Sequence, residues 1–152
     1  MKPSKQTQIH AKKVEELTTP NVTVYIGKAL NLSDEQKSII FEFTKFCDRA
    51  LHLLERYKVY LVSSRKKYGI KTTGAFVDDS NEVWVYSEDR RLIDILRTIS
   101  HEFVHAKQYE ANRHYEPDFL HFSSRNEDEA NYMSGAILNA FAEVVGEIVY
   151  EL

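Results

Sequence analysis

The sequence has little cysteine, no long apolar run and no excess of positive charge, and each shortage excludes a class of protein. Cys47 is the single cysteine among 152 residues, so the chain cannot form an internal disulfide, which fits a reducing compartment. No stretch approaches the ~18 apolar residues of a membrane-spanning helix, and we therefore expect no membrane partner. The formal net charge of -3 gives no electrostatic basis for nucleic acid as the main partner.

The length and composition predict one globular domain. The first residues, MKPSKQTQ, carry no apolar run after their charges, so we expect no secretory signal and a cytoplasmic protein. We expect a single domain over residues 1–152, in which residues 1–20 form an arm that is flexible or contains a short helix from Ile9 to Leu17. Hydrophobic residues make up 43% of the chain and charged residues 28%, as in an ordinary globular protein with its own core.

The hydrophobic pattern predicts an α+β fold with a helix, a small and mostly antiparallel sheet, and then two helices in series. Cys47 falls on the apolar face of the first helix and is expected to be buried. The basic run Ser64–Lys67 is interpreted as a solvated loop. The predicted strands are 22–26, 57–62 and a hairpin of 74–77 with 83–86; the predicted helices are 34–54, which follows a capping box, 89–110, and 124 to the end, with Met133, Ala136, Ile137, Ala140, Phe141, Val144 and Ile148 as its buried face.

The segment TISHEFVHAKQYE places two histidines and a glutamate in the pattern of a zinc peptidase. His101 and His105 lie one helical turn apart on one face, so their imidazoles could converge on one ion. Glu102 lies about 100° around the helix, where its carboxylate reaches a metal-bound water rather than the metal. This geometry suits metal-assisted amide hydrolysis, in which zinc lowers the pKa of water toward about 7 and the glutamate takes the proton. The alternative is two surface histidines that share a helix face.

A catalytic zinc site needs a third protein ligand, and the sequence offers several candidates. Glu127 follows His105 by 22 residues, which is enough for a helix end, a reversal and a second antiparallel helix. Ser124 with Glu127 also forms a capping box, so the alternative is that Glu127 only closes the helix terminus. Glu129 is the next candidate ligand, and His121 would complete a site of three histidines.

The pair of motifs, HEFVH at 101–105 and NEDEAN at 126–131, resembles the gluzincin zinc metallopeptidases. The similarity is closest to small ImmA/IrrE-like and phage-associated zincins and to minigluzincins, and it covers about residues 74–145. The resemblance implies a zincin-like fold in which Glu127 on the following helix is the third ligand and Asn131 orients a histidine ligand. It also implies that Val83–Tyr86 is the edge strand that pairs with an extended peptide. A phage origin, and then a host cytoplasm, is implied by the resemblance alone.

The chain departs from the family in two ways. ImmA/IrrE-type proteins often carry a helix-turn-helix or another sensing domain, and none is visible in this sequence. Larger gluzincins supply a transition-state-stabilising histidine or tyrosine from a C-terminal domain; none is visible in this sequence, so we expect any such group to be local. The local candidates, each more commonly a packing or surface residue, are Tyr109, His114, Tyr115, His121 and Tyr132.

These observations favour a zinc-dependent peptidase of gluzincin type that acts on a peptide or protein segment. His101, His105 and Glu127 are predicted to bind Zn²⁺, and Glu102 is predicted to activate a zinc-bound water that hydrolyses the peptide bond. One alternative is a catalytically inactive zinc-binding module that serves as a protein-interaction domain. Another is a metal-free structural protein in which the histidines are incidental.

Overall fold

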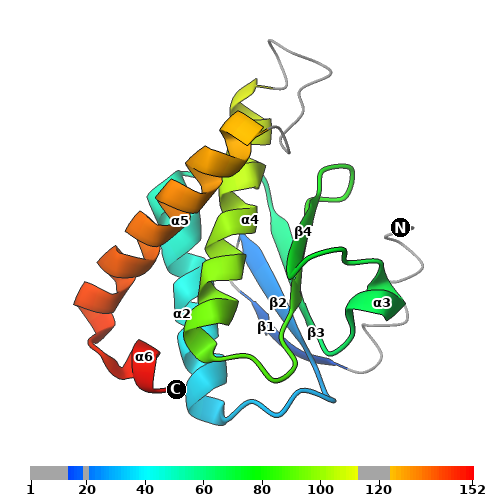
Figure 1. Cartoon of the computed structure of the whole chain (residues 1–152), viewed down its shortest axis with the longest axis vertical. Helices are drawn as coiled ribbons and strands as arrows, with labels where there is room; N and C mark the ends of the chain where they lie inside the picture. The colour runs from blue at the N-terminus through cyan, green and yellow to red at the C-terminus, as the bar shows by residue number, and fades with distance from the viewer. Residues whose placement is uncertain (1–13, 19–20, 113–123) are drawn as a thin grey trace.

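The computed structural model describes residues 14–18, 21–112 and 124–152, and these form an α+β fold with one mixed sheet (Figure 1). The strands are β1 (Val14–Thr18), β2 (Val22–Gly27), β3 (Tyr57–Val62), β4 (Gly74–Val77) and β5 (Glu82–Tyr86). The helices are α2 (Asp34–Leu51), α3 (Arg65–Tyr68), α4 (Leu92–Asn112), α5 (Ser124–Val145) and α6 (Ile148–Glu151).

The five strands pair in the order β1-β2-β3-β5-β4. The central pairings, β2 with β3 and β3 with β5, are parallel, while β1 with β2 and β4 with β5 are antiparallel. The prediction of a mostly antiparallel sheet was therefore wrong. The helix α2 returns the chain to the starting end of β2, so β3 runs beside β2 in the same direction.

The position of the edge strand also differs from the prediction. Val83–Tyr86 belongs to β5, which has β3 on one side and β4 on the other, so it cannot take another strand. The outer strand on this side is β4. The hairpin of β4 and β5 was predicted correctly, but the hydrophobic pattern of two short strands does not show which of them lies at the edge of the sheet.

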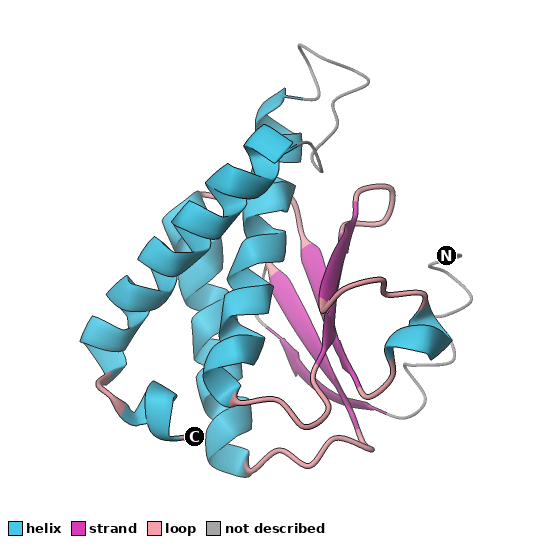
Figure 2. Cartoon of the chain, in the orientation of Figure 1, coloured by secondary structure: helices cyan, strands magenta, loops and turns pink. Residues whose placement is uncertain are grey.

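The helices α2 and α4 cover one face of the sheet, α5 packs outside them, and α3 lies on the other face (Figure 2). Alternate residues of β3 point to opposite faces. Val59 and Leu61 join the main core under the helices, whereas Tyr60 stacks on Trp84 at a ring separation of 4.4 Å on the far face. No helix in the described ranges is long and apolar enough to cross a membrane.

The first helix begins as the sequence predicts and ends earlier. The Ser33 side chain accepts a hydrogen bond from the Gln36 amide, which completes the predicted capping box. Cys47 is fully buried, as predicted, and burial raises the pKa of its thiol well above the ordinary value. His52 adopts a left-handed conformation that ends α2, so the predicted extension to Leu54 was wrong and Leu54 is exposed.

Two segments that lack strong periodicity were assigned wrongly from the sequence. Residues 14–18 form β1 rather than part of a helical arm, because the backbone of β2 offers hydrogen-bond partners along an edge that would otherwise be open. The basic run forms the short helix α3 instead of a loop. Its Ser64 side chain caps the first turn, and Gly69, with a φ of 71°, ends the helix.

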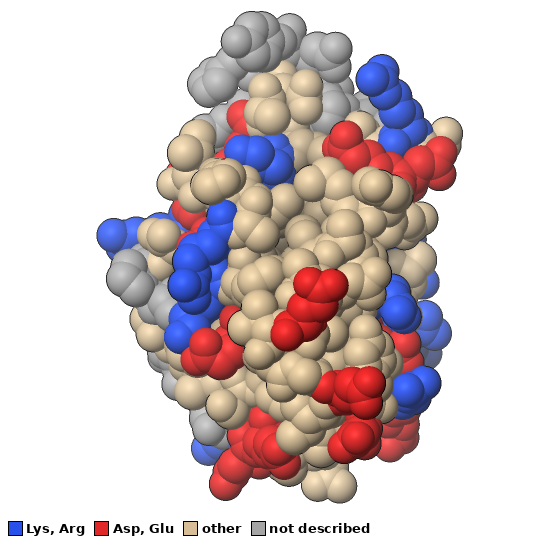
Figure 3. All heavy atoms as spheres, turned by 90° about the vertical axis from the view of Figure 1, so that its left-hand side faces the viewer, with Lys and Arg blue, Asp and Glu red and all other residues tan. Residues whose placement is uncertain are grey.

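The last helix buries only part of the predicted face, since Ile137 and Phe141 are buried as predicted. Ala136, Ala140 and Val144 are exposed, although the sequence pattern assigned them to the core. The buried positions of α5 are Ala130, Ser134, Ile137, Leu138 and Phe141. Because α5 is an outer layer, only one stripe of it contacts α4 and α2, and its outer side is a broad, mainly uncharged surface with scattered acidic side chains (Figure 3).

Candidate metal centre

The helix α4 carries the histidine motif and is fixed by its apolar stripe. Every apolar residue of this stripe is buried. The helix packs against α5 on one side and against β4 and β5 on another, so the histidines face α5 while Glu102 faces β4. The buried stripe consists of Leu92, Leu96, Ile99, Phe103 and Ala106.

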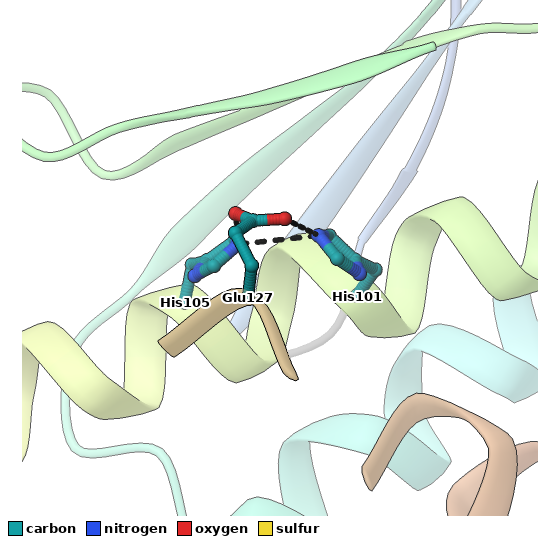
Figure 4. Close-up of side chains that lie close together, drawn as sticks. All are labelled: His101, His105 and Glu127. Atoms are coloured by element: carbon teal, nitrogen blue, oxygen red, sulfur yellow. Dashed lines mark hydrogen bonds and ion pairs between the residues drawn. The ribbon is translucent and has the colours of Figure 1, made fainter. Parts of the chain in front are cut away.

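The two histidines and Glu127 converge at the contact between α4 and α5 (Figure 4). The Nε2 atoms of His101 and His105 lie 3.2 Å apart. One carboxylate oxygen of Glu127 lies 3.2 Å from Nε2 of His101, and the other lies 2.6 Å from Nε2 of His105. The Glu127 carboxylate is thus directed at the imidazoles, as the metal-ligand interpretation requires.

The spacing and chemistry of these three groups fit a divalent transition-metal ion such as zinc. Donor atoms at about 2.1 Å from a tetrahedral zinc lie about 3.4 Å from one another, and the observed separations of 2.6 to 3.2 Å come close to this. Two imidazole nitrogens and one carboxylate oxygen are a donor set that zinc accepts at catalytic sites. His105 is buried, and the side chain of Glu127 is 42% exposed, so the site opens on one side.

A hydrogen-bonded chain fixes the orientation of His105. Its Nδ1 atom lies 2.9 Å from Oε1 of Gln108, and this amide oxygen can only accept the hydrogen bond. The Gln108 amide nitrogen in turn donates to Oε1 of Glu129 at 2.8 Å and to the backbone oxygen of Asn126 at 3.0 Å. With the proton on Nδ1, Nε2 keeps a lone pair, which is the form in which it would bind a metal shared with Glu127.

Glu129 therefore takes a supporting position rather than that of a ligand. Its carboxylate contacts Gln108, and the described side chains that could hold a metal together are His101, His105 and Glu127 without it. Gln108 was not singled out as a functional residue in the sequence, although its place one turn after His105 on the same helix face was a usable signal.

The pKa of the other histidine, His101, lies below its ordinary value. Burial and the adjacent His105 lower it, and Glu127 and the Asn131 side chain offset this in part. A lowered pKa keeps the imidazole neutral, which is the form that binds a metal. Asn131 lies one turn after Glu127 on α5, and the orienting role expected for it stays a prediction.

Glu102 is buried beside this site, and burial raises the pKa of its carboxyl to about 8, with a smaller contribution from the charge of Glu127. A carboxyl with a raised pKa suits general acid–base chemistry near neutral pH. Space for this side chain depends on Gly74 at the start of β4. A methyl group on Gly74 would lie 3.1 Å from Cγ of Glu102 and 2.6 Å from Cγ2 of Thr98.

The burial of Glu102 predicts how the stability of the metal-free protein depends on pH. The unfolded chain loses the Glu102 proton near pH 4.5, whereas the folded chain keeps it up to about pH 8, so stability falls as the pH rises between these values. We expect this residue to lower the free energy of unfolding by on the order of 3 kcal/mol between pH 5 and pH 7.5. Urea denaturation of metal-free wild type and Glu102→Gln tests this, and parallel pH profiles for the two proteins would contradict it.

Replacement of Gly74 by alanine is expected to disturb the same site. The added methyl group must push Thr98 or Glu102 aside, and we expect a loss of about 1–3 kcal/mol in the free energy of unfolding. Gly135→Ala in α5 is the matched control, because a methyl group there meets no atom within 4 Å. Equal unfolding free energies for the two variants, measured in urea, would show that β4 does not press against α4.

The remaining predicted site residues lie elsewhere or cannot be placed. Tyr109 packs against Phe76 in the core, with ring centroids 6.2 Å apart. Tyr132 is 79% exposed on α5 and does not line the pocket beside Glu102. His114, Tyr115 and His121 lie outside the described residues, so the proposals for them stay predictions.

Comparison of the chain with protein-family models, with curated proteins and with solved structures gives no match. The site is thus interpreted from its own geometry and from the two sequence motifs.

Proposed function

We propose that this protein is a zinc-dependent peptidase that hydrolyses a peptide bond held beside Glu102. The observation that carries the proposal is the convergence of the imidazole nitrogens of His101 and His105 with the carboxylate of Glu127, next to a buried glutamate one residue from the first histidine. A purely structural pair of histidines needs neither the third ligand nor the buried acid, and burial of an uncompensated carboxyl costs stability.

The chain supplies the groups that such a reaction needs. Zinc, when bound, would act as a Lewis acid that lowers the pKa of a water toward about 7. Its positive charge would favour the ionised form of Glu102. Glu102 then accepts a proton from the attacking water and delivers it to the nitrogen of the leaving amine. Gln108 holds the His105 imidazole so that its Nε2 atom lies toward Glu127, and Asn131 is proposed to orient His101.

The substrate is proposed to lie along β4, in place of the Val83–Tyr86 position expected from the sequence. β4 is the outer strand of the sheet, and its first residue, Gly74, lies so near Glu102 that an added Cβ would be 3.1 Å from Cγ of Glu102. An extended peptide that pairs with this edge would carry its backbone past the Glu102 carboxylate. Edge pairing uses backbone hydrogen bonds, so it accepts many sequences.

Hydrolysis of a peptide library, read by mass spectrometry, tests this function. We expect cleavage by the zinc-loaded protein, loss of cleavage after treatment with a chelator, and its return when zinc is added. A protein that holds one zinc per chain and binds peptides without cleaving any would overturn the peptidase proposal in favour of an interaction module. Cleavage that a chelator leaves unchanged would point to a contaminating protease.

A further inference from the structure

A pocket of about 300 Å³ lies beside the candidate centre, and most of the residues that line it have no part in the proposed catalysis. It is bounded by Thr72 and Thr73, which lead into β4, and by the first turns of α4 up to His101 and Glu102. Its volume is at the lower end of the range for ligand pockets. A substrate that lies on the edge of β4 therefore passes this pocket before or after it reaches Glu102.

The pocket carries two guanidinium groups and one aspartate besides the candidate catalytic residues. Arg90, Arg97 and Asp94 all line it. Arg90 donates hydrogen bonds to the backbone oxygens of Tyr86 and Asp94, at 2.8 and 3.1 Å, and to Oγ1 of Thr98 at 3.0 Å. These partners are neutral, and among the described residues no carboxylate lies at ion-pair distance from Arg90.

Arg90 is held rigidly while its charge is only partly balanced. Burial lowers the pKa of its guanidinium, and the nearby Asp94 offsets this in part. Arg97 pairs with Asp94 at 3.2 Å, but both side chains are substantially exposed, and an exposed pair of this kind is worth little. Arg97 can therefore exchange Asp94 for a carboxylate of a ligand, and two guanidinium groups face the pocket against one aspartate.

Helix geometry sets the distance between these arginines and the reacting bond. Arg97 lies one turn before His101, and Thr98, which contacts Arg90, lies one turn before Glu102, so each step along the helix axis is about 6 Å. An extended peptide advances about 3.3 Å per residue. A group bound by the arginines belongs to a residue within about two positions of the cleaved bond.

We propose that this pocket is a specificity subsite that binds a carboxylate of the substrate through Arg97 and Arg90. The inference rests on the proposed peptidase function and adds the substrate class, peptides with an acidic group near the cleaved bond. The carboxylate comes from an aspartate or glutamate side chain or from the C-terminus of the peptide. A guanidinium binds a carboxylate with two parallel hydrogen bonds. A peptide that carries glutamine or a C-terminal amide instead of the carboxylate loses both the negative charge and this paired geometry.

Binding to the Glu102→Gln protein, which separates recognition from cleavage, tests the subsite. The probes are three fluorescent nonapeptide pools with random flanking positions: central glutamate with an amidated end, central glutamine with an amidated end, and central glutamine with a free C-terminal carboxylate. We expect about tenfold tighter binding, by fluorescence anisotropy, of one acidic pool over the amidated glutamine pool. The acidic pool that binds more tightly identifies the source of the carboxylate.

In the Glu102→Gln protein, the further substitution Arg97→Gln is expected to abolish this preference. Arg49→Gln is the control and keeps the preference, because Arg49 is exposed on α2. Arg97→Lys should retain part of the preference. Equal binding of the three pools to the parent protein, or a preference that survives Arg97→Gln, overturns the subsite. If the preference is present but the wild-type protein cleaves no peptide, the peptidase proposal fails and the acidic-group site stands. Cleavage without the preference overturns the subsite alone.

Discussion

Replacement of Glu102 by glutamine is expected to lower kcat for peptide hydrolysis by about 10²–10⁴-fold while zinc binding is kept. Glutamine fills the same buried space behind Gly74 but cannot accept a proton from water or deliver one to the amine. Steady-state hydrolysis of a peptide identified from the library gives the rate, and metal analysis of the same sample gives the zinc content.

Glu143→Gln is the matched control for this substitution, because Glu143 is an exposed glutamate on the outer helix α5. This variant should hydrolyse the peptide at the wild-type rate. Wild-type activity in Glu102→Gln would remove Glu102 from the mechanism. A loss of zinc together with activity would mean that the carboxyl supports the metal site rather than the proton transfer.

Zinc is expected to stabilise the folded protein strongly, and the variant His105→Ala should lose this effect. At a free zinc concentration of 100 times Kd, binding to the folded state adds about 2.7 kcal/mol to the free energy of unfolding. For a chain of this size such a gain raises Tm by roughly 5–11 °C. His105 supplies one of the two imidazoles, and its ring is buried against Gln108 and Glu127, so alanine removes one of the three donor groups of the centre.

Thermal unfolding with and without zinc measures the effect, and His52→Asn is its control. His52 is exposed at the end of α2 in a left-handed conformation, which asparagine also tolerates. The control should keep the full zinc-dependent shift. An equal shift in wild type and His105→Ala would place the bound zinc at another site.

Local spacing predicted the parts of the site that lie on single helices. The interval between His101 and His105 places them one turn apart whatever the rest of the fold does. In the same way, the interval between Glu127 and Asn131 places these two residues one turn apart on the second helix. The structure brings the two helices together so that the pairs meet, and the interval of 22 residues between His105 and Glu127 allowed this without dictating it.

Features that depend on contacts between distant segments were not predictable from the pattern. The order of the strands follows from pairings across the sheet, so the sequence identified β4 and β5 without showing that β4 is the outer one. The close approach of Gly74 to Glu102 joins a strand to a helix and leaves no periodic signal. The position of Arg90 beside Thr98 likewise arises from the turn that leads into α4, whereas the place of Arg97 one turn before His101 was visible in the sequence.

The zinc content per chain, measured by native mass spectrometry on wild type, Glu127→Ala and Glu129→Ala, tests the metal centre most directly. Glu129 contacts Gln108 rather than the histidines, so its loss should lower zinc affinity only about 10–100-fold and leave one zinc per chain at saturation. The account predicts one zinc in wild type and in Glu129→Ala and none in Glu127→Ala. Zinc retained in Glu127→Ala, or no zinc in the wild type, would contradict a centre built from His101, His105 and Glu127.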